Sequence, residues 1–360
     1  MQYLALKTNL LTTILVLINL RWLLVSILDM KSAFWSILIV LISLLSINYR
    51  RINLFWGLAL IISTVLVVIS PNRMIDAWYV ILAVLCFKNY PLNKFCRINI
   101  YCSIIIYLIL AYCLSVGIVS ERVMGKAFDA YFESKDFGFG NPNTFAAFLF
   151  YCIIYLYYLN QDKKFEFCIF LILISSFSFL YSGSRTYLIA EIVMFLLIIF
   201  ESISPRPKLK YVIIGLIVFL FLGFYKLLIE NSLIMNILLS SRFEYLNMIL
   251  PNLFRFSSIY GVSVPDEIII DNAYFAMIIY GGLLYFALFI YLLFKAYVTN
   301  FTHQYRLMPI VIPILLSGFF EAGFVVFGSA NILFMWLILL HDGNEKNFGN
   351  CTYLQCKRVP

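Results

Sequence analysis

Long apolar runs follow one another along most of this chain, and no other feature limits its fold as strongly. Residues 9–28 form the first run and residues 98–119 a later one, and neither holds more than one charged residue. A helix needs about 17–25 apolar residues to cross a hydrocarbon core of about 30 Å. The sequence therefore predicts an all-α polytopic membrane protein.

The composition excludes a water-soluble domain. Hydrophobic residues make up 63% of the chain and charged residues 12%, whereas soluble domains hold about 45–50% and about 25% of these two classes. A chain this apolar cannot cover a surface that faces water. Its net charge of +8 does not indicate nucleic acid as a partner, because basic residues in a membrane protein mainly mark the cytoplasmic loops.

Polar breaks between the runs divide residues 1–360 into eleven or twelve transmembrane helices of a single polytopic domain. We expect the spans at 9–28, 32–48, 54–70, 74–88, 98–119, 143–160, 165–182, 185–201, 210–229, 273–296, 307–322 and 324–341. Most of the 26 Lys and Arg residues are cytoplasmic when the N-terminus is placed in the cytoplasm. The positive-inside rule selects this orientation, so we predict a multi-pass protein of the cytoplasmic membrane with both termini in the cytoplasm.

Two predicted extracytoplasmic loops are unusually long, at about 120–142 and 230–272. Loops beyond about 12–15 residues are uncommon and usually functional. In the second loop, apolar residues recur at helical spacing opposite a polar face that includes Arg242 and Glu244. This pattern is typical of a helix that lies in the membrane interface, and we expect short interfacial helices in these loops.

Polar side chains that are costly in a membrane gather at the outer face of this topology. Ionisable groups within spans cost about 2.5–3.5 kcal/mol each on insertion scales, and they are functional hypotheses by default. Glu191 is one such group, and it is as well suited to pairing with another helix as to a functional role. The residues that we expect in a site are Asn141, Asn143, Arg185, Arg242, Arg255, Asp271, Asn272, Tyr274 and Glu321.

Several of these residues also have a purely structural interpretation. Asn141 before Pro142, and the pair Asp271–Asn272, are suited to capping the helices that follow them. Arg185 is placed where it can reach lipid headgroups. Both interpretations stay open for each position.

The residue types indicate a particular ligand chemistry. Arginine offers a fixed fork of donors that matches phosphate in a bidentate manner, so outer arginines suit a lipid-linked diphosphate. Carboxylates accept hydrogen bonds from sugar hydroxyls, and a carboxylate can remove a proton from an attacking hydroxyl. No Cys or His spacing indicates a metal site, and we expect no cofactor.

The order of four segments resembles the Wzy-type O-antigen and capsular polysaccharide polymerases over about residues 138–340. The segments are GFGNPN at 138–143, SGSRT at 182–186, the Arg-bearing loop, and DNAYFAMIIYGGLLYF at 271–286. The chain is also similar, more distantly, to the O-antigen ligases that share their fold. The resemblance implies a GT-C-like, metal-independent glycosyltransferase that joins undecaprenyl-diphosphate-linked oligosaccharide repeat units on the outer face of the membrane. Membrane lipids and a co-polymerase that determines chain length are the other partners it implies.

Residue roles follow from the same resemblance. It implies that Arg185 and Arg242 hold the diphosphate and stabilise its developing charge. Asp271 matches the first position of the motif DNxY, and we expect it to be the third catalytic residue. Asn272 and Tyr274 match the other two positions of the motif DNxY, and we expect both to bind the substrate. We expect four further residues to bind the substrate as well. These are Asn141, Asn143, Arg255 and Glu321.

Two points stay open at the level of sequence. The general base could be Asp271, which position favours, or Glu244, Glu267 or Glu321. The ligases carry a histidine in their large outer loop, whereas both histidines here are expected in the cytoplasm, which favours the polymerase. A lipid-linked oligosaccharide flippase or other transporter is the non-enzyme alternative, although such proteins more often show short loops and inverted repeats.

Overall fold

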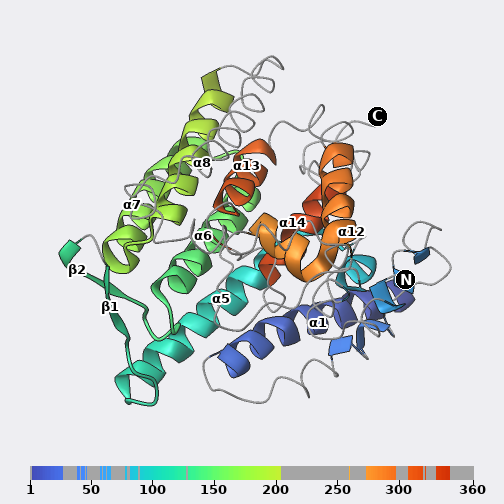
Figure 1. Ribbon diagram of the computed structural model, residues 1–360, viewed down its shortest axis with the longest axis horizontal. Helices are drawn as coiled ribbons and strands as arrows, with labels where there is room; N and C mark the ends of the chain where they lie inside the picture. The colour runs from blue at the N-terminus through green and yellow to red at the C-terminus, as the bar shows by residue number, and fades with distance from the viewer. Residues whose placement is uncertain are drawn as a thin grey trace, which may run out of the picture.

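The computed structural model describes a mostly helical protein (Figure 1). The described residues are 2–26, 39–40, 42–44, 46, 57–58, 60–61, 63–65, 78, 82–87, 90–126, 129–203, 259, 273–296, 307–318, 321 and 330–340. The helices are α1 (Gln2–Ser26), α5 (Leu92–Ser115), α6 (Pro142–Leu159), α7 (Lys164–Ser182), α8 (Arg185–Ile203), α12 (Ala273–Ala296), α13 (Met308–Ser317) and α14 (Ala330–Leu340). Two strands, β1 (Val123–Lys126) and β2 (Asp129–Lys135), lie between α5 and α6.

Three of these helices, α5, α6 and α7, are long and apolar enough to cross a membrane. Shorter apolar helical stretches occur at Thr8–Arg21, Gly282–Tyr291 and Met308–Ser317. The apolar runs therefore form helices as predicted, and they indicate a membrane protein. The expected span at 210–229 lies outside the described residues, and those at 32–48, 54–70 and 74–88 are described only in part.

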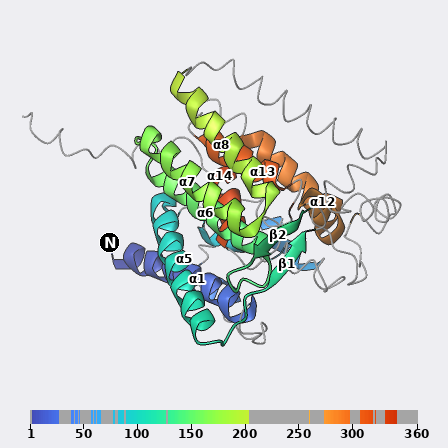
Figure 2. The same cartoon turned by 90° about the vertical axis from the view of Figure 1, so that its left-hand side faces the viewer.

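The helices pack as a bundle in which chain neighbours are mostly neighbours in space (Figure 2). Helix α5 contacts α1 and α6, and α7 packs between α6 and α8. The late helix α13 returns to pack along α8, while α14 contacts α1, α12 and α13. Helices far apart in the sequence, α8 and α13, thus share the most extensive interface among the described elements.

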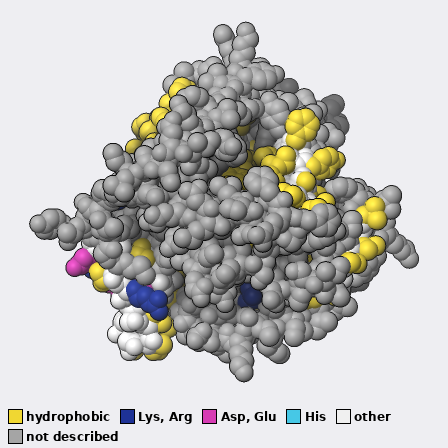
Figure 3. Space-filling model, in the orientation of Figure 1, with side chains coloured by type: hydrophobic (Ala, Val, Ile, Leu, Met, Phe, Trp, Pro, Cys, Tyr) yellow, Lys and Arg dark blue, Asp and Glu magenta, His cyan; other side chains and the backbone are white. Residues whose placement is uncertain are grey.

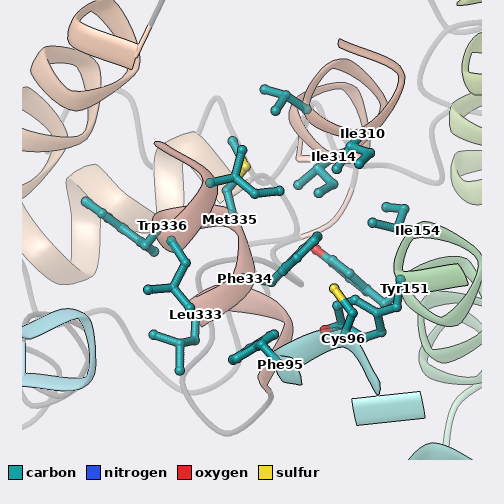
Figure 4. Packing of buried hydrophobic residues seen from close by; sticks show 14 of the residues in the cluster. Phe95, Cys96, Tyr151, Ile154, Ile310, Ile314, Leu333, Phe334, Met335 and Trp336 are labelled. Carbon is teal, nitrogen blue, oxygen red and sulfur yellow. The ribbon is translucent and has the colours of Figure 1, made fainter. Parts of the chain in front are cut away.

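Aromatic side chains fill the core where α5, α6, α13 and α14 meet (Figure 4). Phe334 of α14 stacks on Phe95 of α5 at 5.8 Å between ring centroids. The same ring meets Tyr155 of α6 edge to face at 4.9 Å, and all three side chains are buried. Such pairs contribute about 0.5–1.5 kcal/mol each beyond the area they bury, so they fix how α14 sits against the two earlier helices.

The outward faces of α5 and α7 are hydrophobic. Leu108 and Tyr112 of α5 are exposed, as are Leu173 and Leu180 of α7. Yellow side chains reach the surface in several places on the face shown in Figure 3. Because moving a Leu side chain out of water is worth about 1.5–3 kcal/mol, these faces suit contact with lipid.

The first long loop differs from the expectation of short interfacial helices, and the all-α prediction is wrong there. Strands β1 and β2 form an antiparallel hairpin in which Val123 pairs with Lys135 and Gly125 with Glu133. Tyr131 and Phe132 within β2 are residues that favour a pleated surface. Packing of β2 against α7 supports this short hairpin. The helix expected within 230–272 lies outside the described residues.

Helix α12 covers the predicted range 273–296 but is broken in its middle. Gly282 has φ 76° and ψ 170°, a conformation that is essentially restricted to glycine. The apolar run gave no sign of the break, because both halves are equally hydrophobic.

Candidate functional site

One end of the bundle, next to β1 and β2, is called the hairpin end here. Strand β2 contacts α7, and Phe137, just after β2, stacks on Tyr181 near the end of α7 at 4.2 Å. Lys135 also places its Nζ 5.8 Å from the Tyr181 ring centroid, within the range of a cation–π contact. The hairpin is therefore fixed over the end of α7, one turn before α8 begins.

Helix α6 starts at this end with the cap that the sequence predicts. The Oδ1 atom of Asn141 accepts a hydrogen bond of 2.8 Å from the backbone N–H of Asn143, and Pro142 occupies the first helical position. Gly138 and Gly140 precede the cap with positive φ angles of 79° and 77°, which glycine adopts without steric cost. The capping interpretation of Asn141 is confirmed, and its side chain is exposed.

The Asn143 side chain makes a separate, long-range contact. Its Nδ2 atom donates a hydrogen bond of 2.9 Å to Oε1 of Glu321, which lies 178 positions later in the chain. Both residues are half-buried. The structure thus brings two of the expected site residues into direct contact, one from the start of α6 and one from just beyond α13.

Helix α12 begins beside Gly318, which follows α13 directly and precedes Glu321 by three positions. The backbone N–H of Ala273 donates to the carbonyl oxygen of Gly318 at 2.8 Å, and Glu321 donates its own N–H to Ser317 at 2.9 Å. The Tyr274 hydroxyl donates to the carbonyl oxygen of Leu315 at 2.6 Å. Tyr274, which we expected to bind substrate, therefore anchors α12 to α13.

Arg185 is the first residue of α8 and follows a tight turn after α7. Gly183 ends α7 in the left-handed conformation, with φ 57°, and donates its N–H to Phe179 at 2.7 Å. Ser184 donates its N–H to the hydroxyl oxygen of Ser182 at 3.1 Å. The turn places Arg185 at the hairpin end with an exposed side chain. Backbone N–H groups at a helix start favour anions, which suits the predicted phosphate contact.

Four of the expected site residues, Arg242, Arg255, Asp271 and Asn272, lie outside the described residues. Asn272 directly precedes Ala273 in the chain. The structure therefore brings Asn143 and Glu321 together and ties the start of α12 to the same turn, and it leaves these four positions as predictions.

Sequence reasoning missed the role of Asp136. This residue is fully buried, and its Oδ1 atom accepts hydrogen bonds from the backbone N–H groups of Arg122 at 3.0 Å and Gly138 at 2.9 Å. It thereby closes the base of the hairpin. A signal was present, because an Asp two residues before a Gly is typical of a turn in which the carboxylate accepts from its own backbone.

Glu191 lies deep in α8 with an exposed fraction of 1%. The hydroxyl of Ser175 on α7 interacts with this carboxyl group, and neither group has another hydrogen-bond partner within the described part of the chain. Ionisable groups in such places are uncommon and usually functional. Glu191 was identified from the sequence as an intramembrane carboxyl but not placed in the expected site.

The opposite end of α6, α7 and α8 holds a different polar cluster. Lys164 forms an ion pair of 2.9 Å with Glu201, and the Tyr157 hydroxyl donates to the other Glu201 oxygen at 3.1 Å. This cluster joins three helices. Among the described residues, no three His, Cys, Asp or Glu side chains lie close enough together to hold a metal ion.

Comparison of the chain with protein-family models, with curated proteins and with solved structures finds no match.

Proposed function

We propose that this chain is a glycosyltransferase of the cytoplasmic membrane that polymerises oligosaccharide repeat units linked to undecaprenyl diphosphate. The proposal includes about twelve spans in a GT-C-like arrangement and a product that belongs to O-antigen or capsule. The observation that carries it is the Asn143–Glu321 hydrogen bond of 2.9 Å. This bond holds the Asn143 and Glu321 side chains together at the hairpin end, and Arg185 begins α8 at the same end.

The chemistry follows from the residue types at this end. Arg185 and the predicted Arg242 and Arg255 bind the diphosphate and stabilise the charge that develops as it leaves. Asn141, Asn143 and Asn272 offer both donors and acceptors to sugar hydroxyls. The acceptor sugar of a second lipid-linked unit then attacks the donor sugar, so the chain grows by one repeat unit. Asp271 and Glu321 are the carboxylates proposed for this site.

One observation favours a second candidate, a transporter that moves lipid-linked oligosaccharides. Glu191 is a fully buried carboxyl within α8, and charged groups deep in a helix bundle often mark the path of a transported substrate. The hairpin end has no evident role in that mechanism, so we place the transferase first.

The proposal is tested in cells by the length of the polysaccharide. We expect Arg185→Ala to leave a single repeat unit on its lipid, while the level of the protein in the membrane stays normal. Arg97→Ala is the matched control, because Arg97 is an exposed arginine on α5 near the expected cytoplasmic end. A full ladder of chain lengths from Arg185→Ala would contradict the proposed role of this residue.

A further inference from the structure

We propose that Glu321 takes the proton from the acceptor hydroxyl and that Asn143 is the residue that positions its carboxylate. This inference rests on the proposed function and adds the general base, which the sequence left open among four carboxylates. Position in the sequence favoured Asp271, whereas the placement of the described acidic side chains in the structure favours Glu321.

Three of the described carboxylates are badly placed for this task. Asp136 is fully buried and its Oδ1 atom already accepts two backbone hydrogen bonds. Glu191 is fully buried within α8, so an acceptor sugar cannot reach it. Glu201 is paired with Lys164 at the opposite end of the bundle.

Three other carboxylates with described side chains lie at the hairpin end, and they differ in how firmly they are held. Glu121 and Glu133 are exposed on the loop and the hairpin. Glu321 is half-buried and is held by the side-chain amide of Asn143 at 2.9 Å. A general base has to lie within hydrogen-bond reach of the proton that it removes, and a half-buried, oriented carboxylate meets this need better than a fully exposed one.

Glu321 is also held through its backbone N–H. Its N–H donates to Ser317 at 2.9 Å, which continues the helical pattern of α13, and Gly318 accepts from Ala273 at 2.8 Å. The start of α12 is therefore bonded to Gly318 just after α13, and Glu321 is bonded to the last residue of α13. Groups held in this way lose little further freedom when a substrate binds, which lowers the barrier to reaction.

Asn143 suits a positioning role because its backbone N–H and its side-chain amide bind different partners. Its backbone N–H completes the cap with Asn141, whereas its side-chain amide is directed to Glu321. An amide carries no net charge, so it orients a carboxylate without forming an ion pair with it. A carboxylate offers about four acceptor sites on its two oxygens, so the bond from Asn143 is compatible with a hydrogen bond from a sugar hydroxyl.

The proposed step balances without a further reactant. The acceptor oxygen forms a bond to the anomeric carbon of the donor sugar, and the bond from that carbon to the diphosphate oxygen breaks. The bonding electron pair leaves with the diphosphate, next to Arg185. The acceptor proton passes to the Glu321 carboxylate and then to water.

The test uses the purified full-length protein in detergent with lipid-linked repeat units as donor and acceptor, and kcat and KM are measured. We expect Glu321→Gln to lower kcat by about 10²–10⁴-fold, the usual contribution of a general base, with little change in KM. Asn143→Ala should lower kcat by about 10-fold or more, because a misplaced catalytic group is costly. The cap at Asn141 stays intact in Asn143→Ala, since it uses the backbone.

A double substitution separates positioning from a general structural effect. If Asn143 acts through Glu321, adding Asn143→Ala to Glu321→Gln should change kcat by less than about twofold, because coupled residues are not additive. Azide needs no deprotonation, so it should restore donor turnover in Glu321→Ala and yield a glycosyl azide. Unfolding temperatures of all variants, measured in the same detergent, identify losses of activity that come from misfolding.

The outcomes are distinct. Wild-type protein that polymerises, together with Glu321→Gln at an unchanged kcat, would overturn this inference and leave the proposed function standing. Fully additive effects of the two substitutions would overturn the positioning role of Asn143. A wild-type protein that forms no polymer would overturn the proposed function and this inference with it.

Discussion

The hydroxyl of Tyr274 donates a hydrogen bond of 2.6 Å to the carbonyl oxygen of Leu315 and so ties the start of α12 to α13. Tyr274→Phe removes this hydroxyl donor and keeps the aromatic ring. We expect the free energy of unfolding to fall by about 1–3 kcal/mol, because the carbonyl oxygen of the buried residue Leu315 loses this hydrogen-bond donor. Thermal unfolding in detergent measures the change. Unchanged stability with weaker substrate binding would instead support the role in substrate binding that the DNxY motif suggested.

Arg185 should not tolerate lysine. Lysine keeps the charge but lacks the planar fork that binds phosphate in a bidentate manner. We therefore expect Arg185→Lys to lose at least about 10-fold in polymerisation rate and to recover only part of the loss seen in Arg185→Ala. The rates of the two variants with lipid-linked repeat units are the measurement, and Arg97→Lys is the control. Full activity in Arg185→Lys would show that a point charge is sufficient there.

Asp136 should govern the order of the hairpin. Asp136→Ala removes the acceptor for the N–H groups of Arg122 and Gly138, at an expected cost of about 1–3 kcal/mol for the donor of the buried Gly138. Limited proteolysis should then cut between residues 120 and 138 sooner than in the wild type. Asp136→Asn keeps a carbonyl oxygen at the same position and should resist cutting as the wild type does. Equal cutting of Asp136→Ala and the wild type would show that the carboxylate does not hold the loop.

The helices and the hairpin end differ in how far the sequence could predict them. The ranges expected for α6, α7 and α12 agree with the structure within a few residues, because uninterrupted apolar runs and the Asn141–Pro142 cap mark helix bounds locally. The contact of Asn143 with Glu321 could not be predicted, since hydropathy does not show which helices pack together. The hairpin was missed because its longer strand, Asp129–Lys135, has only seven residues. So few residues hardly show the alternation of apolar and polar side chains that indicates a strand.

Gly282 illustrates the same limit within a single helix. Its φ of 76° and ψ of 170° are essentially closed to other residues, so we expect Gly282→Ala to destabilise the protein by about 1–3 kcal/mol. Gly281 is helical, so Gly281→Ala is the matched control and should be neutral or stabilising. The measurement is the unfolding temperature of each variant compared with that of the wild type. A stable Gly282→Ala would mean that α12 is continuous in the membrane.

The most direct test of the proposed function uses purified wild-type protein in vesicles that carry lipid-linked repeat units on the face of the membrane expected to be extracytoplasmic. We expect a ladder of polymer lengths to form without added nucleotide or metal, and we expect Arg185→Ala to form none. Movement of the lipid-linked units across the bilayer without any polymer would contradict the transferase and favour the transporter.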